Sequence, residues 1–161
     1  MLVKAVSRKY FEGICREHGF TDANMPNDMF FICIHNTNGE NSTPYFKQDH
    51  PNVLKLAFDD CSQDETGTLL SGEPYTQKAM TKEQAQIIYD FLIAQKQNGV
   101  QKGLLHCSAG ISRSGAVVTF AADVLEVDQT AFKKMNQYIQ PNPHVMSLLN
   151  GILWEQIWKN D

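Results

Sequence analysis

Residues 104–115, LLHCSAGISRSG, hold a cysteine and an arginine with five residues between them. The whole chain has only four cysteines and three arginines, so the spacing of Cys107 and Arg113 stands out. A phosphate dianion needs donors that converge from several directions, and backbone N–H groups at a helix N-terminus supply them together with the helix dipole. The guanidinium of Arg113 can hold two phosphate oxygens at once. The spacing therefore predicts that residues 107–113 form a phosphate-binding loop.

The small residues of this loop suit it to nucleophilic chemistry as well as to binding. Ala109 and Gly110 let the backbone approach a bound anion closely. The positive field that binds a phosphate also favours the thiolate of Cys107, and cysteines in such settings have pKa values of about 3.5 to 7.5 instead of about 8.5. We therefore expect the loop to carry a nucleophile beneath the bound phosphate.

The segments that flank the loop must position it. Residues 102–107, KGLLHC, form a short apolar run that predicts a buried strand. Residues 112–126, SRSGAVVTFAADVLE, begin with small residues and predict a helix. A strand, a tight loop and a helix in this order are the context that a phosphate-binding loop requires.

The rest of the chain alternates between predicted strands and helices. Further strands are predicted at 2–6, 29–35 and 53–58. One further helix is predicted from Ser7 to Gly19, and a second begins at the capping pair Thr81 and Gln84 and runs through Asn98 to a stop at Gly99. Two more are predicted at about 128–139 and, after Pro141 and Pro143, toward Trp154 and Trp158. This alternation predicts an α/β fold with a central, mainly parallel sheet flanked by helices. With 161 residues and 42% hydrophobic content, one domain over 1–161 is expected.

Net charge and hydropathy indicate which kinds of partner and which cellular location to expect. The net charge is -4 and the pI about 5.7, with no charged tail, so neither nucleic acid nor an anionic membrane is the expected partner. The first residues, MLVKAVSRKYFEG, lack the apolar run of a signal peptide, and no segment approaches the roughly 18 apolar residues that cross a bilayer. We therefore expect a cytoplasmic protein.

The four cysteines show no metal-binding spacing. No CxxC pair occurs, which argues against a zinc site, and no cofactor or metal is expected. Cys15 and Cys33 are predicted to be buried thiols. Cys33 or Cys61 could also trap Cys107 as a reversible disulfide after oxidation, an alternative that the sequence leaves open.

Three stretches resemble a known family. HCSAGISRS matches the H-C-x5-R-S/T signature of the cysteine-dependent protein tyrosine phosphatase superfamily, and AGISRS is most similar to its dual-specificity branch. VLKLAFDD, residues 53–60, resembles the strand and general-acid loop of these enzymes, and PNPHV, residues 141–145, resembles a segment after their signature helix. The resemblance covers about residues 30–150.

The resemblance implies a role for each residue of the signature. Cys107 is the nucleophile that forms a cysteinyl-phosphate intermediate, and Arg113 binds the phosphoryl group and the transition state. Ser114 hydrogen-bonds the sulfur and eases its departure, although a polar residue in a first helical turn is also ordinary. His106 orients the loop. The phosphate-binding residues are Ser108, Ala109, Gly110, Ile111, Ser112 and Arg113.

The reaction also needs a carboxyl group that alternates between acid and base. Alignment of VLKLAFDD with the family pattern selects Asp60 as the general acid, with Asp59, and then Asp64 or Glu65, as alternatives. Asp60 precedes Cys107 by a longer stretch than compact dual-specificity enzymes have. The excess falls in 61–80, a polar segment that we expect to form a mobile lid or a recognition insert.

The resulting expectation is a protein phosphatase that acts on phosphotyrosine, with or without phosphoserine and phosphothreonine. Its partner would be a phosphorylated protein or peptide, and a phosphate or sulfate ion would bind in the loop. SAGIS contains no lysine, which disfavours the multiply charged headgroup of a phosphoinositide. The alternative is a catalytically idle module that binds phosphorylated partners.

The remaining conspicuous side chains receive structural interpretations. Trp154 and Trp158 are expected on the apolar face of the last helix. Tyr45 and Phe46 are expected to anchor a long loop, and His144 is expected to be structural, without a visible partner.

Overall fold

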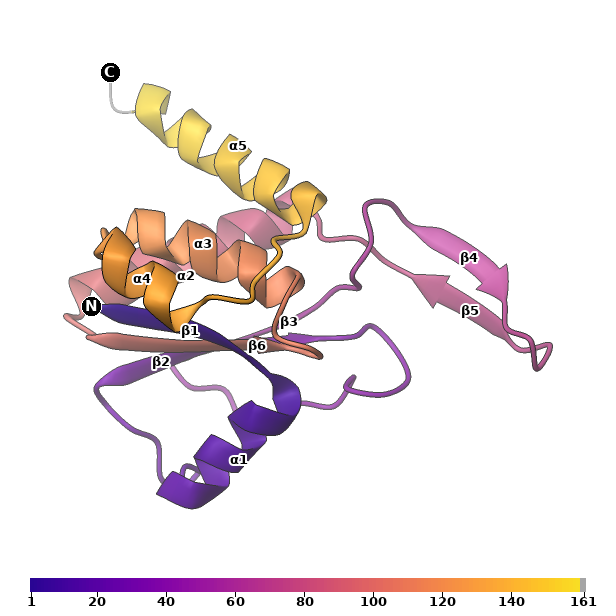
Figure 1. Cartoon of the computed structure of the whole chain (residues 1–161), viewed down its shortest axis with the longest axis horizontal. Coiled ribbons are helices and arrows are strands. Elements are labelled where there is room, and N and C mark those ends of the chain that lie inside the picture. Colours follow the sequence, from indigo (N-terminus) through magenta and orange to yellow (C-terminus); the bar gives the residue numbers. More distant parts are fainter. Residues whose placement is uncertain (160–161) are drawn as a thin grey trace.

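Four parallel strands form the central sheet of the computed structural model, which describes residues 1–159. The strands are β1 (Leu2–Ser7), β2 (Met29–His35), β3 (Val53–Ala57) and β6 (Lys102–Cys107), and their spatial order is β1-β6-β2-β3 (Figure 1). The register places Ser7 beside Cys107 and Cys33 beside His106, so the carboxyl ends of these strands meet at one edge of the sheet. Ligands bind at this edge in open α/β sheets.

Helices cover both faces of the sheet. α1 (Arg8–His18) lies on one face, and the other face carries α2 (Lys82–Gln97), α3 (Arg113–Val124), α4 (Gln129–Met135) and α5 (Pro143–Lys159) (Figure 1). Alternate residues of β2 serve the two cores: Phe31 and Cys33 pack with α1, and Ile32 and Ile34 pack in the larger core with α2, α3 and α5. The predicted α/β fold is therefore confirmed.

The predicted helix boundaries rest on caps that the structure contains. The Ser7 hydroxyl accepts a hydrogen bond from the Tyr10 amide at 3.1 Å, and Gly19 ends α1 in the left-handed conformation with φ 69°. Thr81 and Gln84 form the reciprocal capping box of α2, with bonds of 3.0 and 3.2 Å. Each cap satisfies backbone groups that a helix end leaves without partners.

The segment 61–80 contains secondary structure that the sequence did not predict. It contains an antiparallel hairpin, β4 (Glu65–Thr68) and β5 (Pro74–Gln77), which forms a second sheet of its own. Its strands alternate between polar, small and aromatic residues with no apolar face to bury, so hydrophobic periodicity does not reveal them.

Two smaller predictions near the C-terminus were also wrong. The helix expected over 128–139 ends at Met135. The last helix, α5, begins at Pro143 instead of after it, because a proline is well tolerated in a first helical turn. His144, which was expected to be structural, lies with its Nε2 2.9 Å from the carbonyl oxygen of Met80.

The aromatic residues divide into anchored and exposed pairs. Phe46 is buried and the Tyr45 hydroxyl donates to the Phe20 carbonyl at 3.0 Å, so this pair anchors the loop as predicted. Trp154 and Trp158 are instead 62% and 59% exposed and pack edge to face on each other, with ring centroids 5.6 Å apart. They do not belong to the buried face of α5.

Candidate active site

The 107–113 loop links β6 to α3 at the carboxyl edge of the sheet. Gly110 has φ 76°, and a Cβ there would lie 2.3 Å from the carbonyl carbon of Val6. Only glycine therefore fits where the loop packs against the junction of β1 and α1. The amide of Arg8, at this junction, donates to the carbonyl of Ser108 at 3.2 Å and holds the loop from the same side.

The thiol of Cys107 lies at the base of this loop, 2% exposed. The Gly110 amide donates to its sulfur at 3.3 Å, and the Ser114 hydroxyl oxygen lies 3.1 Å from it. Burial alone would raise the pKa of the thiol. The hydrogen bonds from Ser114 and Gly110, together with the Arg113 charge, outweigh this effect and hold the pKa of Cys107 below its ordinary value.

Hydrogen bonds to uncharged oxygen atoms hold the Arg113 guanidinium in place. One terminal nitrogen donates to the Asn36 side-chain oxygen and to the Phe58 carbonyl, both at 2.8 Å, and the other donates to the Ser108 hydroxyl at 3.1 Å. Nε has no hydrogen bond, and no carboxylate lies within ion-pairing distance of Arg113 among residues 1–159. The buried guanidinium therefore keeps its positive charge for an added anion.

Asn36, which supports Arg113, was not singled out in the sequence. It follows β2 directly, and its side-chain oxygen also accepts from the Ser108 hydroxyl at 3.3 Å. Asn41, in the same loop, donates to that hydroxyl at 3.2 Å. The signal was available, because polar residues that follow neighbouring parallel strands meet at one edge of the sheet.

The two adjacent aspartates occupy different environments. The Asp59 carboxylate is 8% exposed and accepts hydrogen bonds from the Thr37 amide at 3.1 Å, the Thr37 hydroxyl and the Lys78 amide at 2.8 Å. Burial by itself would raise the pKa of Asp59. These hydrogen bonds and the Arg113 charge lower the pKa by more than burial raises it, so the pKa lies below its ordinary value. Asp59 therefore releases its proton readily and is held in place as a carboxylate.

Asp60 is exposed and faces the loop. Its Oδ1 accepts from the Ser112 hydroxyl at 2.8 Å and from the Asn142 side-chain nitrogen at 2.7 Å, whereas Oδ2 accepts none within residues 1–159. The Asn142 amide also donates to the Ser112 carbonyl at 3.0 Å. Asn142, another residue that the sequence did not single out, thus joins the Asp60 turn to the loop.

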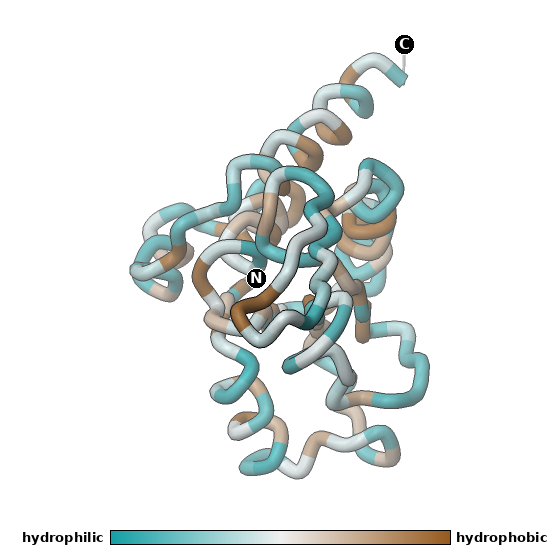
Figure 2. The backbone as a smooth tube through the Cα atoms, turned by 90° about the vertical axis from the view of Figure 1, so that its right-hand side faces the viewer, coloured by the Kyte–Doolittle hydropathy of each residue, from teal (hydrophilic) through white to brown (hydrophobic). Residues whose placement is uncertain are grey.

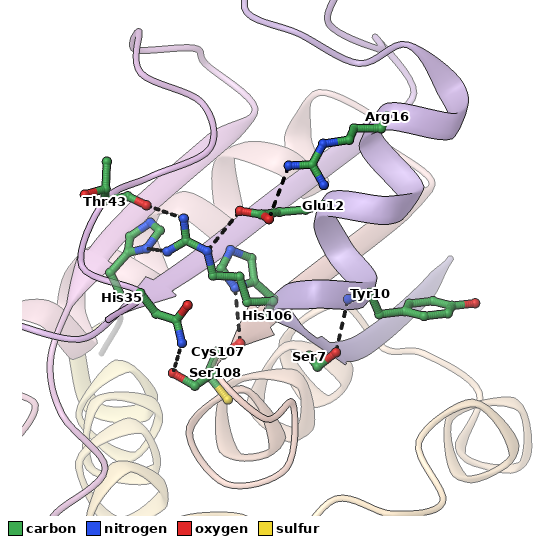
Figure 3. A network of polar contacts seen from close by, with 11 residues as sticks. Ser7, Tyr10, Glu12, Arg16, His35, Thr43, His106, Cys107 and Ser108 are labelled. Atoms are coloured by element: carbon green, nitrogen blue, oxygen red, sulfur yellow. Dashed lines mark hydrogen bonds and ion pairs between the residues drawn. The ribbon is translucent and has the colours of Figure 1, made fainter. Parts of the chain in front are cut away.

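His106 is buried behind Cys107 (Figure 3). Its Nδ1 lies 3.3 Å from the Cys107 carbonyl oxygen, and its ring packs on Phe11 with centroids 4.3 Å apart. Burial lowers the pKa of His106 to about 3, so the ring is neutral near pH 7. The side chain therefore positions the end of β6 and contributes no charge to the thiolate.

Arg8 connects α1 to the loop after β2. Its guanidinium donates to Glu12 at 3.0 Å and to the Thr43 carbonyl, and it lies 3.4 Å from Nδ1 of His35. The ring of His35 is 5.6 Å from that of His106, measured between centroids. The back of the site is therefore a packed, hydrogen-bonded layer.

Neither of the two cysteines proposed for redox trapping is favoured. Cys33 packs with Phe11 and Cys15 on the α1 face of the sheet, whereas Cys107 packs in the core on the other face, so the sheet separates the two thiols. Cys61 is partly buried. Burial, and then the charges of nearby carboxylates, raise the pKa of Cys61 and disfavour its reactive thiolate.

A cleft of about 650 Å³ opens above the loop. Ser108 and Arg113 line one side, Asp59 and Asp60 lie beside them, and the hairpin forms the other side. The remaining lining residues are Asn36, Asn38, Leu69, Tyr75, Thr76 and Gln77. Asp64 and Glu65 do not line this cleft.

This arrangement can be compared with solved structures. The human tyrosine phosphatase-like serine/threonine/tyrosine-interacting protein is 19% identical, with a TM-score of 0.55 over 94% of this chain and 87% of that protein. The PTP-2 phosphatase of Cydia pomonella is 14% identical, with a TM-score of 0.57 over 94% and 85% of the two chains. The chain has the protein tyrosine phosphatase fold.

A third structure with this fold, PTPMT1 in complex with PI(5)P, is 14% identical, with a TM-score of 0.50 over 99% of this chain and 95% of that one. No family model and no curated protein matches the sequence. Within residues 1–159, no helix is long and apolar enough to span a membrane. In the same part of the chain, no three His, Cys, Asp or Glu side chains group closely enough to hold a metal ion.

Proposed function

We propose that this protein is a cysteine-dependent phosphatase that hydrolyses phosphotyrosine in proteins or peptides through a cysteinyl-phosphate intermediate. One observation carries the proposal: a thiol of lowered pKa and an arginine that has no ion-pair partner among residues 1–159 lie at opposite ends of one tight loop. The free amides of that loop and the Arg113 guanidinium would bind the phosphoryl oxygens, as donors at a helix N-terminus do for anions.

In the first step the Cys107 thiolate attacks phosphorus. The bond from phosphorus to the tyrosine oxygen breaks, and that oxygen takes a proton from Asp60. We assign the proton to Asp60 because it lines the cleft and its Oδ2 accepts no hydrogen bond within residues 1–159, whereas three hydrogen bonds hold Asp59 as a carboxylate. Ser112 and Asn142 hold Asp60 through its other oxygen.

In the second step a water molecule attacks the same phosphorus. The Asp60 carboxylate takes a proton from the water, the bond from sulfur to phosphorus breaks, and inorganic phosphate leaves. The Ser114 hydroxyl, 3.1 Å from the sulfur, stabilises the departing thiolate by a hydrogen bond. Together the two steps return Cys107 to its thiolate and Asp60 to its protonated form, and neither step requires a cofactor.

The charge of the cleft supports a singly phosphorylated substrate. Among residues 1–159, Arg113 is the only basic residue that lines the cleft, and two aspartates line it as well. A phosphoinositide headgroup with several phosphates would lack cations for the additional charges.

A second function, binding without turnover, is favoured by one of the comparisons. The human protein of this fold is named as phosphatase-like and as an interacting protein. Against this alternative, the present chain retains both Cys107 and Arg113 in hydrogen-bonded positions.

The four cysteines are free thiols, which supports our further proposal of a reducing, cytoplasmic location.

The test is hydrolysis of para-nitrophenyl phosphate in excess EDTA by the wild type and by Cys107→Ser. We expect turnover in the wild type that EDTA leaves unchanged and that the substitution abolishes. Retained turnover in Cys107→Ser would overturn the assignment of the nucleophile. A folded wild type that binds phosphate but does not turn over would favour the binding module.

A further inference from the structure

The β4–β5 hairpin lies outside the main sheet and adds little to the core. Its strands pair only with each other, and their side chains are exposed or partly exposed. Figure 1 shows that it projects beyond the carboxyl edge of the sheet, away from the helical layers. An isolated two-stranded hairpin is only marginally stable in water. Stability of the fold therefore does not explain this segment.

The hairpin is nevertheless fastened at its base to the proposed active site. The Asn38 side chain donates to the Thr76 carbonyl at 3.0 Å. The Asp59 amide donates to the Lys78 carbonyl at 2.7 Å, and the Lys78 amide donates back to the Asp59 carboxylate at 2.8 Å. The turn that carries Asp60 thus also sets the direction in which the hairpin leaves the body of the protein.

Two side chains of the hairpin present apolar surface to the cleft. The ring of Tyr75 packs over Gly67 so closely that a Cβ at Gly67 would lie 2.6 Å from it, which fixes the ring in place. Leu69, 49% exposed, lies in the turn and lines the same cleft. Its neighbour Leu70 is fully exposed and does not line the cleft. In Figure 2, viewed from the hairpin side, the foremost turn carries one hydrophobic stretch among hydrophilic and neutral segments.

We propose that the hairpin is the substrate-recognition element of this site, and that Leu69 and Tyr75 bind a large apolar side chain flanking the phosphotyrosine. The inference rests on the proposed function and names its preferred substrates. The cleft, at about 650 Å³, has room for a neighbouring side chain beyond the phosphorylated one. An apolar residue there would cover the exposed surface of Leu69.

The charges that line the cleft indicate which kind of flanking residue the site should prefer. Asp59 and Asp60 line it, and its only basic residue, Arg113, would be occupied by the phosphoryl group. An acidic residue of the peptide in this place would meet the Asp59 carboxylate without a cation to pair with. The site should therefore prefer leucine to aspartate at the flanking position that reaches the hairpin.

Leu69 and Leu70 offer a matched pair for the test, because they are neighbours in one exposed turn and only Leu69 lines the cleft. We would measure kcat/KM on phosphotyrosyl peptides in which leucine or aspartate is placed in turn at each flanking position. Para-nitrophenyl phosphate, which has no flanking residues, is the reference substrate. Leu69→Ala should lower the ratio of kcat/KM for the best leucine peptide to kcat/KM for para-nitrophenyl phosphate by about tenfold. Leu70→Ala should leave this ratio unchanged.

Equal effects of Leu69→Ala and Leu70→Ala, or no preference for leucine over aspartate at any position, would overturn the inference while leaving the proposed function intact. Faster hydrolysis of phosphatidylinositol 5-phosphate in phosphatidylcholine vesicles than of any peptide would also overturn it.

If the wild type hydrolyses neither peptide nor para-nitrophenyl phosphate, the proposed function fails. The inference is then tested by binding of the labelled peptides to Cys107→Ser, with Leu69→Ala or Leu70→Ala added. Weaker binding of the leucine peptide with Leu69→Ala alone would support it, and equal binding by both would contradict it.

Discussion

The 107–113 loop and the β4–β5 hairpin form two sides of one cleft and differ in how firmly they are held. Cys107 and Arg113 are buried, and the loop is hydrogen-bonded to the first residue of α1, to Gln140 and Asn142 before α5, and to the segment after β2. The hairpin is exposed along both strands and is attached mainly at its base. Chemistry requires fixed donors, whereas recognition of a flanking side chain requires only a positioned surface. Substitutions in the loop should therefore affect turnover and folding, and those in the hairpin should affect substrate choice.

The largest effect is expected at Arg113. Arg113→Ala removes the only basic group of the cleft and should lower kcat/KM for para-nitrophenyl phosphate by about a thousandfold, because a buried charge that stabilises the transition state is lost. Arg16→Ala, which removes a largely exposed arginine of α1, serves as the control and should leave kcat/KM unchanged. Similar rates for the two variants would mean that the loop does not bind the phosphoryl group as described.

The two aspartates should separate catalysis from structure. Asp60→Asn should lower kcat/KM by about a hundredfold for substrates with poor leaving groups and much less for good ones, since only the former need the proton in the first step. Asp59→Asn should instead lower the free energy of unfolding by about 2 kcal/mol, because it leaves buried donors without a charged acceptor. Steady-state kinetics on a series of aryl phosphates, together with urea denaturation, measure both. A steeper leaving-group dependence for Asp59→Asn than for Asp60→Asn would exchange the assignments.

Two glycines with positive φ, one in the 107–113 loop and one in the hairpin turn, test whether the loop is packed more tightly than the hairpin. Gly110→Ala would place a Cβ 2.3 Å from the backbone of Val6 and should lower the free energy of unfolding by about 3 kcal/mol, or prevent folding. Gly72→Ala, in the hairpin turn with φ 88°, has no atom within 4 Å of the new Cβ, so only backbone strain of about 1 kcal/mol is expected. Denaturation midpoints compare the two variants directly. A larger loss at Gly72 would contradict the account of the loop.

The smallest effect concerns the ionisation of Cys107. Because its pKa is lowered, kcat/KM should rise with pH on the acid side and reach its plateau below the ordinary thiol value of 9.0. Ser114→Ala removes the hydroxyl that helps lower this pKa, so the rise should move to higher pH, and kcat should fall by about tenfold as sulfur departure slows. A pH profile of Ser114→Ala that coincides with that of the wild type would remove Ser114 from the mechanism.

The sequence predicted the elements that share a strong local signal. β2 and β6 were predicted to the residue because strands buried on both faces are continuous apolar runs, and the ends of α1 and α2 follow from local caps. The hairpin was missed because its strands bury no face, so their polar residues carry no periodic pattern. The correct predictions of the two strands and of the helix ends depend on residues that are neighbours in the chain.

The same division applies to the site. Cys107, Arg113 and Ser114 belong to one contiguous motif, and the sequence placed them together. Asn36 and Asn142 reach the loop from other elements, and only the tertiary structure shows their hydrogen bonds to Arg113 and Asp60. The choice between the aspartates likewise required the directions of the two side chains, which adjacent positions in the sequence cannot distinguish.

The most direct test of the central claim is to detect the covalent intermediate. An acid-quenched reaction of the Asp60→Asn variant with a good aryl phosphate should accumulate phosphorylated enzyme, because the proton acceptor for the attacking water is missing. Mass spectrometry of the digested protein should place the phosphate on Cys107. Phosphate on any other residue, or turnover with no phosphoenzyme despite a kinetic burst of the released phenol, would contradict the account.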